Sequence, residues 1–171
     1  PGTDNIDFAY VTARSAQLLE AVTGVSQVAH PTDDLVPADL TASSPGFLPR
    51  LQAGSLKIGP NTLFVLNPAG NDVRDSAVDD PTATATVGAE NTLEIIRLLV
   101  GAGARTIVVP TFPPLGLLAE STNLNPDGSR RAKAEARAIG AAAYNALMAE
   151  GLPGVGGNIV VVDFDTLFRE V

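Results

Sequence analysis

The chain alternates short apolar runs with longer segments whose apolar residues recur at helical spacing. The runs at 5–11, 61–67 and 105–112 are rich in Val, Ile, Leu and Phe, and "NIVVVDF" at 158–164 forms a fourth. Gly, Pro, Asn and Asp bound most of these runs. Continuous apolar runs of this length predict the buried strands of a parallel sheet.

Helices are predicted between the strands. Residues 13–24 read as a helix that ends at Gly24, and residues 46–54 read as a short helix interrupted by Pro49. Residues 25–46 hold turn formers and three prolines, which predicts a long connection with little regular structure.

Two longer helices are expected in the second half of the chain. One lies within 80–104 and ends near Gly101 and Gly103, and the other lies within 129–151 with Ser129 as its N-cap. The apolar residues expected to be buried are Leu93, Ile96, Leu99 and Val100 in the first helix, and Ile139, Tyr144, Leu147 and Met148 in the second.

Strands alternating with helices predict an α/β protein with three layers, in which helices cover both faces of a parallel sheet. The chain shows no internal repeat, so residues 1–171 are interpreted as a single domain. Ligands of open α/β sheets bind beyond the carboxyl ends of the strands. The segments that follow the predicted strands are Tyr10–Ala13, Pro68–Asp72, Thr111–Gly116 and Asp163–Asp165.

Composition excludes several function classes. With 11 basic against 19 acidic residues and a net charge of −8, a general nucleic-acid-binding surface is not expected. The absence of Cys and the presence of a single His exclude thiolate and multi-histidine metal sites within this chain. No apolar run approaches the roughly 20 residues of a membrane span.

Common nucleotide and hydrolase motifs are also missing. The chain lacks a phosphate-binding G-x-x-x-x-G-K-[ST] loop, a G-x-G-x-x-G motif after a strand, and a G-x-S-x-G nucleophile elbow. No metal or organic cofactor is therefore expected.

The segment Gly70-Asn71-Asp72 is the strongest candidate for chemistry. Its Asn follows a predicted central strand, where the side-chain amide can stabilise a developing oxyanion. Gly70 and Asp72 would support the loop. The alternative reading is an ordinary turn, because Asn and Asp also favour turns.

The surrounding motifs resemble those of the SGNH, or GDSL, family of serine esterases and lipases. In that family a G-x-N-D motif follows the third strand, and its Asn donates to the oxyanion; "FVLNPAGND" matches it with Asn71 in the donor position. "NIDFAYVTARS" is similar to the second motif, N-[FY]-A-x-G-G-A, and "GARTIVVPTFPPLG" is similar to a later strand and loop. The subgroup most resembled contains secreted and autotransporter-type enzymes.

Two departures from the family motifs matter. The first Gly of G-x-N-D is Ala69 here, and the two glycines of the second motif align with Val11 and Thr12. The resemblance implies that the backbone of Val11 or Thr12 joins Asn71 in the oxyanion hole, although Cβ atoms there would crowd a substrate. Substrate-pocket candidates by position are Tyr10, Phe112 and Leu115.

The nucleophile and the base are expected outside this chain. In the family, the Ser lies in a GDSL motif before the second strand, and the His lies in a D-x-x-H motif after the last one. Ser55 and His30 read as loop residues, and Asp163 and Asp165 read as helix-capping residues. The chain thus reads as an incomplete domain without the family's first strand and C-terminal end, neither stable nor active by itself.

The resemblance implies a carboxylic ester hydrolase that acts on small-molecule or lipid esters, exported to the surface or surroundings of a bacterium. The remainder of the same protein would complete its fold. Two alternatives remain open: a non-catalytic domain of the same fold, and a flavodoxin-like ligand-binding domain.

Overall fold

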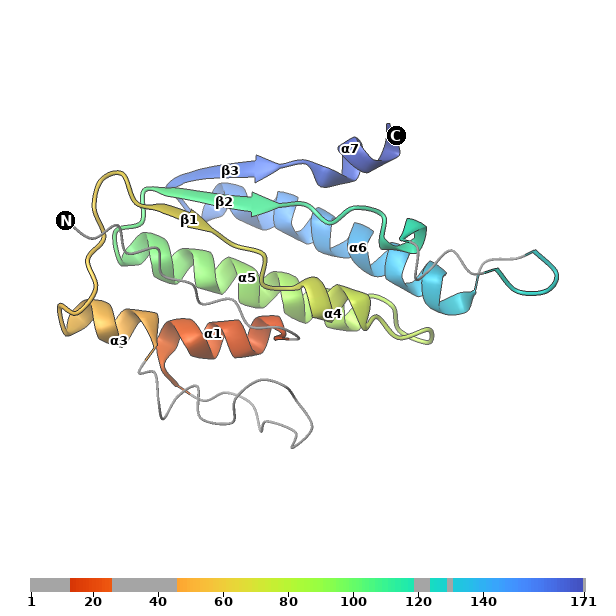
Figure 1. Ribbon diagram of the computed structural model, residues 1–171, viewed down its shortest axis with the longest axis horizontal. Helices are drawn as coiled ribbons and strands as arrows, with labels where there is room; N and C mark the ends of the chain where they lie inside the picture. Colours follow the sequence, from red (N-terminus) through yellow and green to blue (C-terminus); the bar gives the residue numbers. More distant parts are fainter. Residues whose placement is uncertain (1–12, 26–45, 119–123, 129–130, 171) are drawn as a thin grey trace.

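The computed structural model describes residues 13–25, 46–118, 124–128 and 131–170 (Figure 1). The strand predicted at 5–11, most of the connection predicted at 25–46, and His30 lie outside these residues.

Three parallel strands form the sheet, in the order β1-β2-β3. They are β1 (Leu63–Val65), β2 (Thr106–Pro110) and β3 (Asn158–Val162). The register pairs Phe64 with Ile107 and Ile107 with Ile159, so these three side chains point to the same side of the sheet. The parallel sheet and the α/β class predicted from the sequence are confirmed.

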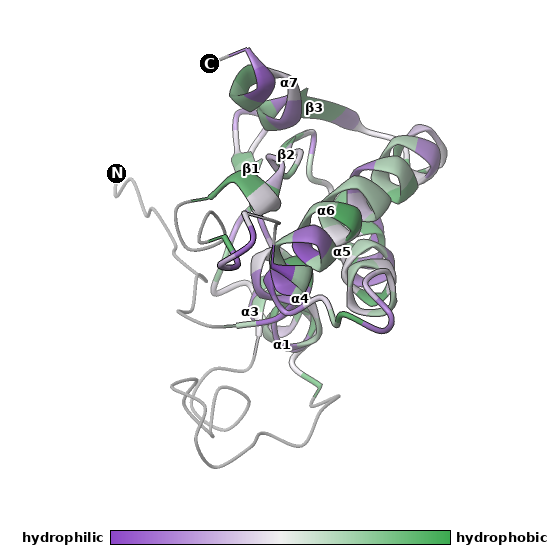
Figure 2. Ribbon diagram, turned by 90° about the vertical axis from the view of Figure 1, so that its right-hand side faces the viewer, coloured by the Kyte–Doolittle hydropathy of each residue, from purple (hydrophilic) through white to green (hydrophobic). Residues whose placement is uncertain are grey.

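The helices lie on one side of the sheet (Figures 1 and 2). Their order along the chain explains this arrangement, because right-handed crossovers that advance across a sheet in one direction place all their helices on one face. The α-helices are α1 (Ser15–Thr23), α3 (Phe47–Gln52), α4 (Gly70–Arg74), α5 (Ala83–Gly101), α6 (Ala132–Gly151) and α7 (Phe164–Arg169), and short 3-10 helices span Leu115–Leu117 and Leu152–Gly154.

The core lies between the sheet and helices α5 and α6. Ile107 and Val109 of β2 are buried against the predicted stripe of α5, which is confirmed at Leu93, Ile96 and Leu99. Val100 is partly buried against the same cluster, as are Tyr144, Met148 and Leu147 of α6 to differing degrees.

Ile139 of α6 is a wrong prediction, because its side chain is 41% exposed. The buried face of α6 instead includes Ala136, Gly140 and Tyr144. A Cβ at Gly140 would collide with Ser76 and with the carbonyl of Pro81, so small residues let α6 approach the segment after α4 closely. Hydrophobicity alone pointed to the larger Ile.

Helix ends agree with the sequence in one case and differ in two. Gly24 ends α1 in the left-handed region, with φ of 73°, as expected for a C-terminal glycine. Pro49 does not interrupt α3, because it lies in the first turn, where the backbone N–H has no partner within the helix. The N-cap of α6 is Arg131, whereas the predicted Ser129 lies outside the described residues.

The opposite side of the sheet, here called the outer face, is apolar and uncovered within the described residues. Its side chains come from alternate positions of the three strands and are Leu63, Val65, Val108, Val160 and Val162. Val65 is 69% exposed and Leu63 is 57% exposed. Figure 2 shows the strands as largely hydrophobic, with α5 and α6 on one side of them. The second helical layer predicted from the sequence therefore stays a prediction.

Candidate functional site

The segment Gly70-Asn71-Asp72 forms the first turn of α4, directly beyond the carboxyl end of β1 (Figure 1). It is therefore the start of a short helix and not an isolated turn. The site predicted from topology, at the carboxyl end of a parallel strand, holds this helix start.

Asn71 is half-buried, and its side chain is oriented by the backbone of a distant segment. The amide Nδ2 donates a hydrogen bond of 2.8 Å to the carbonyl oxygen of Ala13. A side-chain amide carries two N–H bonds, and this contact uses one of them. The second N–H is the group that could stabilise an oxyanion.

Asp72 is buried, with 5% exposure, and holds the amino end of α1. Its two carboxylate oxygens accept hydrogen bonds of 2.8 Å from the backbone N–H and from the hydroxyl of Ser15. Burial raises the pKa of the Asp72 carboxyl above its ordinary value, while the hydrogen bonds from Ser15 act in the opposite direction. This carboxylate therefore anchors one segment to another.

A third polar side chain completes this contact. Asn91 of α5 donates from Nδ2 to the hydroxyl oxygen of Ser15 at 3.0 Å. Neither Ser15 nor Asn91 was singled out from the sequence. Each lies more than 50 residues from at least one of its partners, and no local pattern reports such a pairing.

Ala69, which replaces the first Gly of the resembled motif, fits its position without strain. It is the N-cap of α4 with φ of −109°, a conformation open to any residue. Its Cβ faces Gly88 of α5, where an added Cβ would lie 2.9 Å from Ala69. The glycine at 88 thus leaves room for the extra methyl group at 69.

The other predicted site residues divide into two groups. Tyr10, Val11 and Thr12 lie outside the described residues. Phe112 and Leu115 are core residues, 6% and 8% exposed.

Phe112 is held on both sides by neighbours from α6. Its ring packs edge-on against Tyr144, with ring centroids 4.7 Å apart. Its backbone N–H donates to Oδ1 of Asn145 at 2.8 Å, and its carbonyl accepts from Nδ2 of the same residue at 2.9 Å. In this structure the ring is part of the core.

The two residues read as non-catalytic from the sequence have structural contacts. Asp163 is the N-cap of α7 and accepts hydrogen bonds from the backbone N–H and hydroxyl of Thr166, at 3.0 and 2.6 Å. These bonds lower the pKa of the Asp163 carboxyl. The predicted capping role of Asp163 is confirmed. Ser55 is exposed and donates its hydroxyl to the carbonyl of Arg50 at 2.9 Å.

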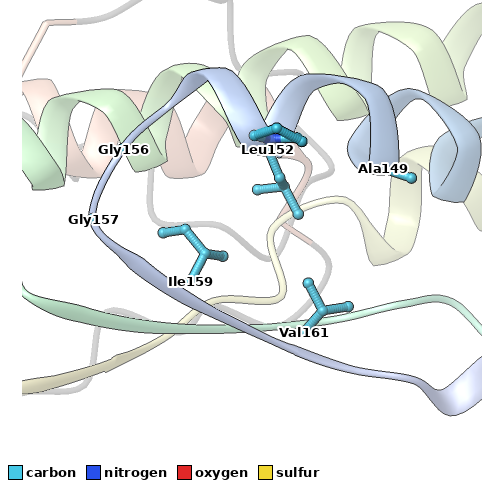
Figure 3. A pocket seen from close by; sticks show the side chains of 7 residues that line it. Ala149, Leu152, Gly156, Gly157, Ile159 and Val161 are labelled. Atoms are coloured by element: carbon cyan, nitrogen blue, oxygen red, sulfur yellow. The ribbon is translucent and has the colours of Figure 1, made fainter.

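A separate hollow of about 370 Å³ lies between the end of α6 and β3 (Figure 3). Its lining consists of Ala149, Leu152, Pro153, Gly156, Gly157, Ile159 and Val161. The lining holds no titratable side chain, and it begins before β3, at the amino ends of the strands. The hollow is therefore at the opposite end of the sheet from α4.

Two searches of the described part of the chain returned nothing. No three His, Cys, Asp or Glu side chains there are grouped so that they could hold a metal ion. No helix there is both long and apolar enough to cross a membrane.

The fold and the α4 segment define an α/β protein with a polar site beyond β1. No family model matches the chain. A protein of Pseudomonas putida, described as an uncharacterized protein in the trpE-trpG intergenic region, is 32% identical to it over 100 residues. The match covers 58% of this chain and only 16% of that protein, so the chain spans a small part of the relative's length.

Proposed function

We propose that this chain is part of a carboxylic ester hydrolase of the SGNH type, in which Asn71 donates to the oxyanion hole. The substrate class is a small-molecule or lipid ester. Export to the bacterial surface or surroundings follows from the subgroup that the sequence resembles.

The observation that carries the proposal is the hydrogen bond between Asn71 and Ala13. The resemblance assigns two motifs, 58 residues apart, to one oxyanion hole. Asn71 belongs to one of them, and Ala13 directly follows Val11 and Thr12 of the other. The distance of 2.8 Å from Asn71 Nδ2 to the carbonyl oxygen of Ala13 joins these two motifs.

The proposed role of Asn71 is electrostatic. Attack of a serine hydroxyl on an ester carbonyl places negative charge on the carbonyl oxygen, which the free N–H of the Asn71 amide would stabilise. One such donor is worth roughly 3 kcal/mol of the reaction barrier. The nucleophilic Ser, the His base and its orienting Asp would come from the rest of the protein.

The three-layer fold is part of the same proposal. The exposed outer face and the free edge of β1 support it, because parallel sheets are normally buried on both faces. A strand added beyond β1 would reverse the direction of travel across the sheet, and its right-handed connection would then place a helix on the outer face. The remainder of the protein would supply both elements.

A non-catalytic domain of the same fold is the second candidate. The burial of Phe112 and Leu115 favours it, because the residues expected to line an acyl pocket are packed in the core. Val11 and Thr12, in place of two glycines, point the same way.

Hydrolysis of a chromogenic ester by the full-length protein distinguishes the two candidates. The proposal expects Asn71→Ala to lower the rate about 100-fold or more. Asn67→Ala is the matched control, because Asn67 is an exposed Asn at the end of β1. An inactive wild-type protein, or equal rates in both variants, would favour the non-catalytic domain.

A further inference from the structure

A continuous chain of hydrogen bonds connects three helices beneath Asn71. Asn91 on α5 donates to the Ser15 hydroxyl at 3.0 Å, and this hydroxyl donates to Asp72 on α4 at 2.8 Å. Ser15 is the first residue of α1 and has no exposed surface. The chain is therefore an internal polar link between α5, α1 and α4.

This link fixes the group that orients Asn71. Ala13, whose carbonyl accepts from the Asn71 amide, lies two residues before Ser15. Ser15 is held to Asp72 by two hydrogen bonds, and Asp72 directly follows Asn71. Three hydrogen bonds thus join residues 13–15 to residues 71–72, and a shift of Ser15 would move the Ala13 carbonyl relative to Asn71.

Stability alone gives a weak reason for such an arrangement. Taking a carboxylate out of water is costly, and apolar residues of similar volume often stabilise a protein as well or better. Burial does raise the pKa of Asp72, which reflects this cost. Hydrogen bonds add direction, which an apolar contact lacks.

We propose that Asp72, Ser15 and Asn91 are positioning residues for the oxyanion donor, acting through the carbonyl of Ala13 on the amide of Asn71. The inference rests on the proposed ester hydrolase function. It adds two residues, Ser15 and Asn91, that lie outside the resembled motif around Asn71.

Steady-state kinetics of the full-length protein on a chromogenic ester test the inference. Ser15→Ala and Asn91→Ala should each lower kcat about 10-fold with little change in KM, because a misplaced donor weakens stabilisation of the transition state. Thr92→Val is the control. It removes an equally buried hydroxyl of α5, which donates to the carbonyl of Gly88 at 2.7 Å and has no part in the link. Its kcat should be unchanged.

A double-mutant cycle separates positioning from general loss of structure. In the Asn71→Ala background, Ser15→Ala should change the residual kcat less than twofold, because the group on which it acts is gone. An equal 10-fold loss in both backgrounds, or unchanged kcat in Ser15→Ala alone, would overturn the positioning role while leaving the function in place. An unchanged rate in Asn71→Ala would overturn the proposed function itself, and the positioning role with it.

Discussion

Two regions of this protein reverse the usual distribution of polar and apolar side chains. The junction of α1 and α4, formed by Ala13, Ser15, Asn71 and Asp72, buries a carboxylate and a hydroxyl. The outer face of the sheet leaves valines and a leucine in solvent, with Val65 69% exposed.

The difference between the two regions lies in their partners. At the junction, both oxygens of Asp72 and the Ser15 hydroxyl have hydrogen-bond partners within the described residues. The outer face has no layer against it there. The junction is thus complete by itself, whereas the outer face is a surface that a parallel sheet normally covers.

The largest expected effect is on the junction. Asp72→Ala leaves the buried N–H and hydroxyl of Ser15 without their acceptor, and we expect the free energy of unfolding to fall by about 4 kcal/mol. Urea denaturation of the full-length protein measures it. The control is Asp75→Ala, which breaks an ion pair with Arg14 whose side chains are about half exposed and should cost less than about 1 kcal/mol. Equal losses would show that the junction is no more important than a surface pair.

The next effect concerns the outer face. If a further layer covers it, Val65→Lys buries an unpaired charge and should destabilise the full-length protein by about 3 kcal/mol. Val87→Lys, at a 49% exposed position on α5, is the control and should change stability by less than about 0.5 kcal/mol. Thermal or urea unfolding measures both, and a silent Val65→Lys would mean that the face is open to solvent.

Close packing between α4 and α5 gives a smaller effect. A methyl group added by Gly88→Ala would lie 2.9 Å from the Cβ of Ala69 and 3.2 Å from that of Asp72, so we expect a loss of about 2 kcal/mol. Ala69→Gly in the same chain removes the closer contact and should restore part of the loss. Gly101→Ala, where nothing lies within 4 Å of the added methyl group, should not destabilise.

The smallest effect is on the pH dependence of stability. Because burial raises the pKa of Asp72 in the folded state, its contribution is greatest below the ordinary value of 3.8 and decreases as pH rises through the folded-state pKa. Asp163 behaves oppositely, since its lowered pKa gives stability above 3.8 that is lost as pH falls. Relative to Asp72→Asn, wild type should thus lose stability as pH rises, whereas relative to Asp163→Asn it should gain. Equal slopes would contradict the assigned causes.

The sequence predicted the elements of the fold but not their long-range contacts. The apolar runs located β1, β2 and β3, and the spacing of Leu93, Ile96 and Leu99 located the buried face of α5, because both depend on local periodicity. It misjudged Ile139, where the close approach of Gly140 to Ser76 decides which face of α6 is buried.

The site was predicted in part for the same reason. Asn71 was found because its position after a strand can be read locally. Ser15 and Asn91 were not, because their roles depend on contacts across 57 and 76 residues. Phe112 and Leu115 were expected to line a pocket from their place after β2, yet the packing of α6 buries both.

The most direct test of the central claim is the kcat of Asn71→Ala for ester hydrolysis, measured on full-length protein whose unfolding midpoint matches that of wild type. The proposal predicts a loss of about 100-fold in kcat with KM little changed, because the amide acts on the charge of the transition state. A kcat within twofold of wild type would contradict the role of Asn71 as an oxyanion donor.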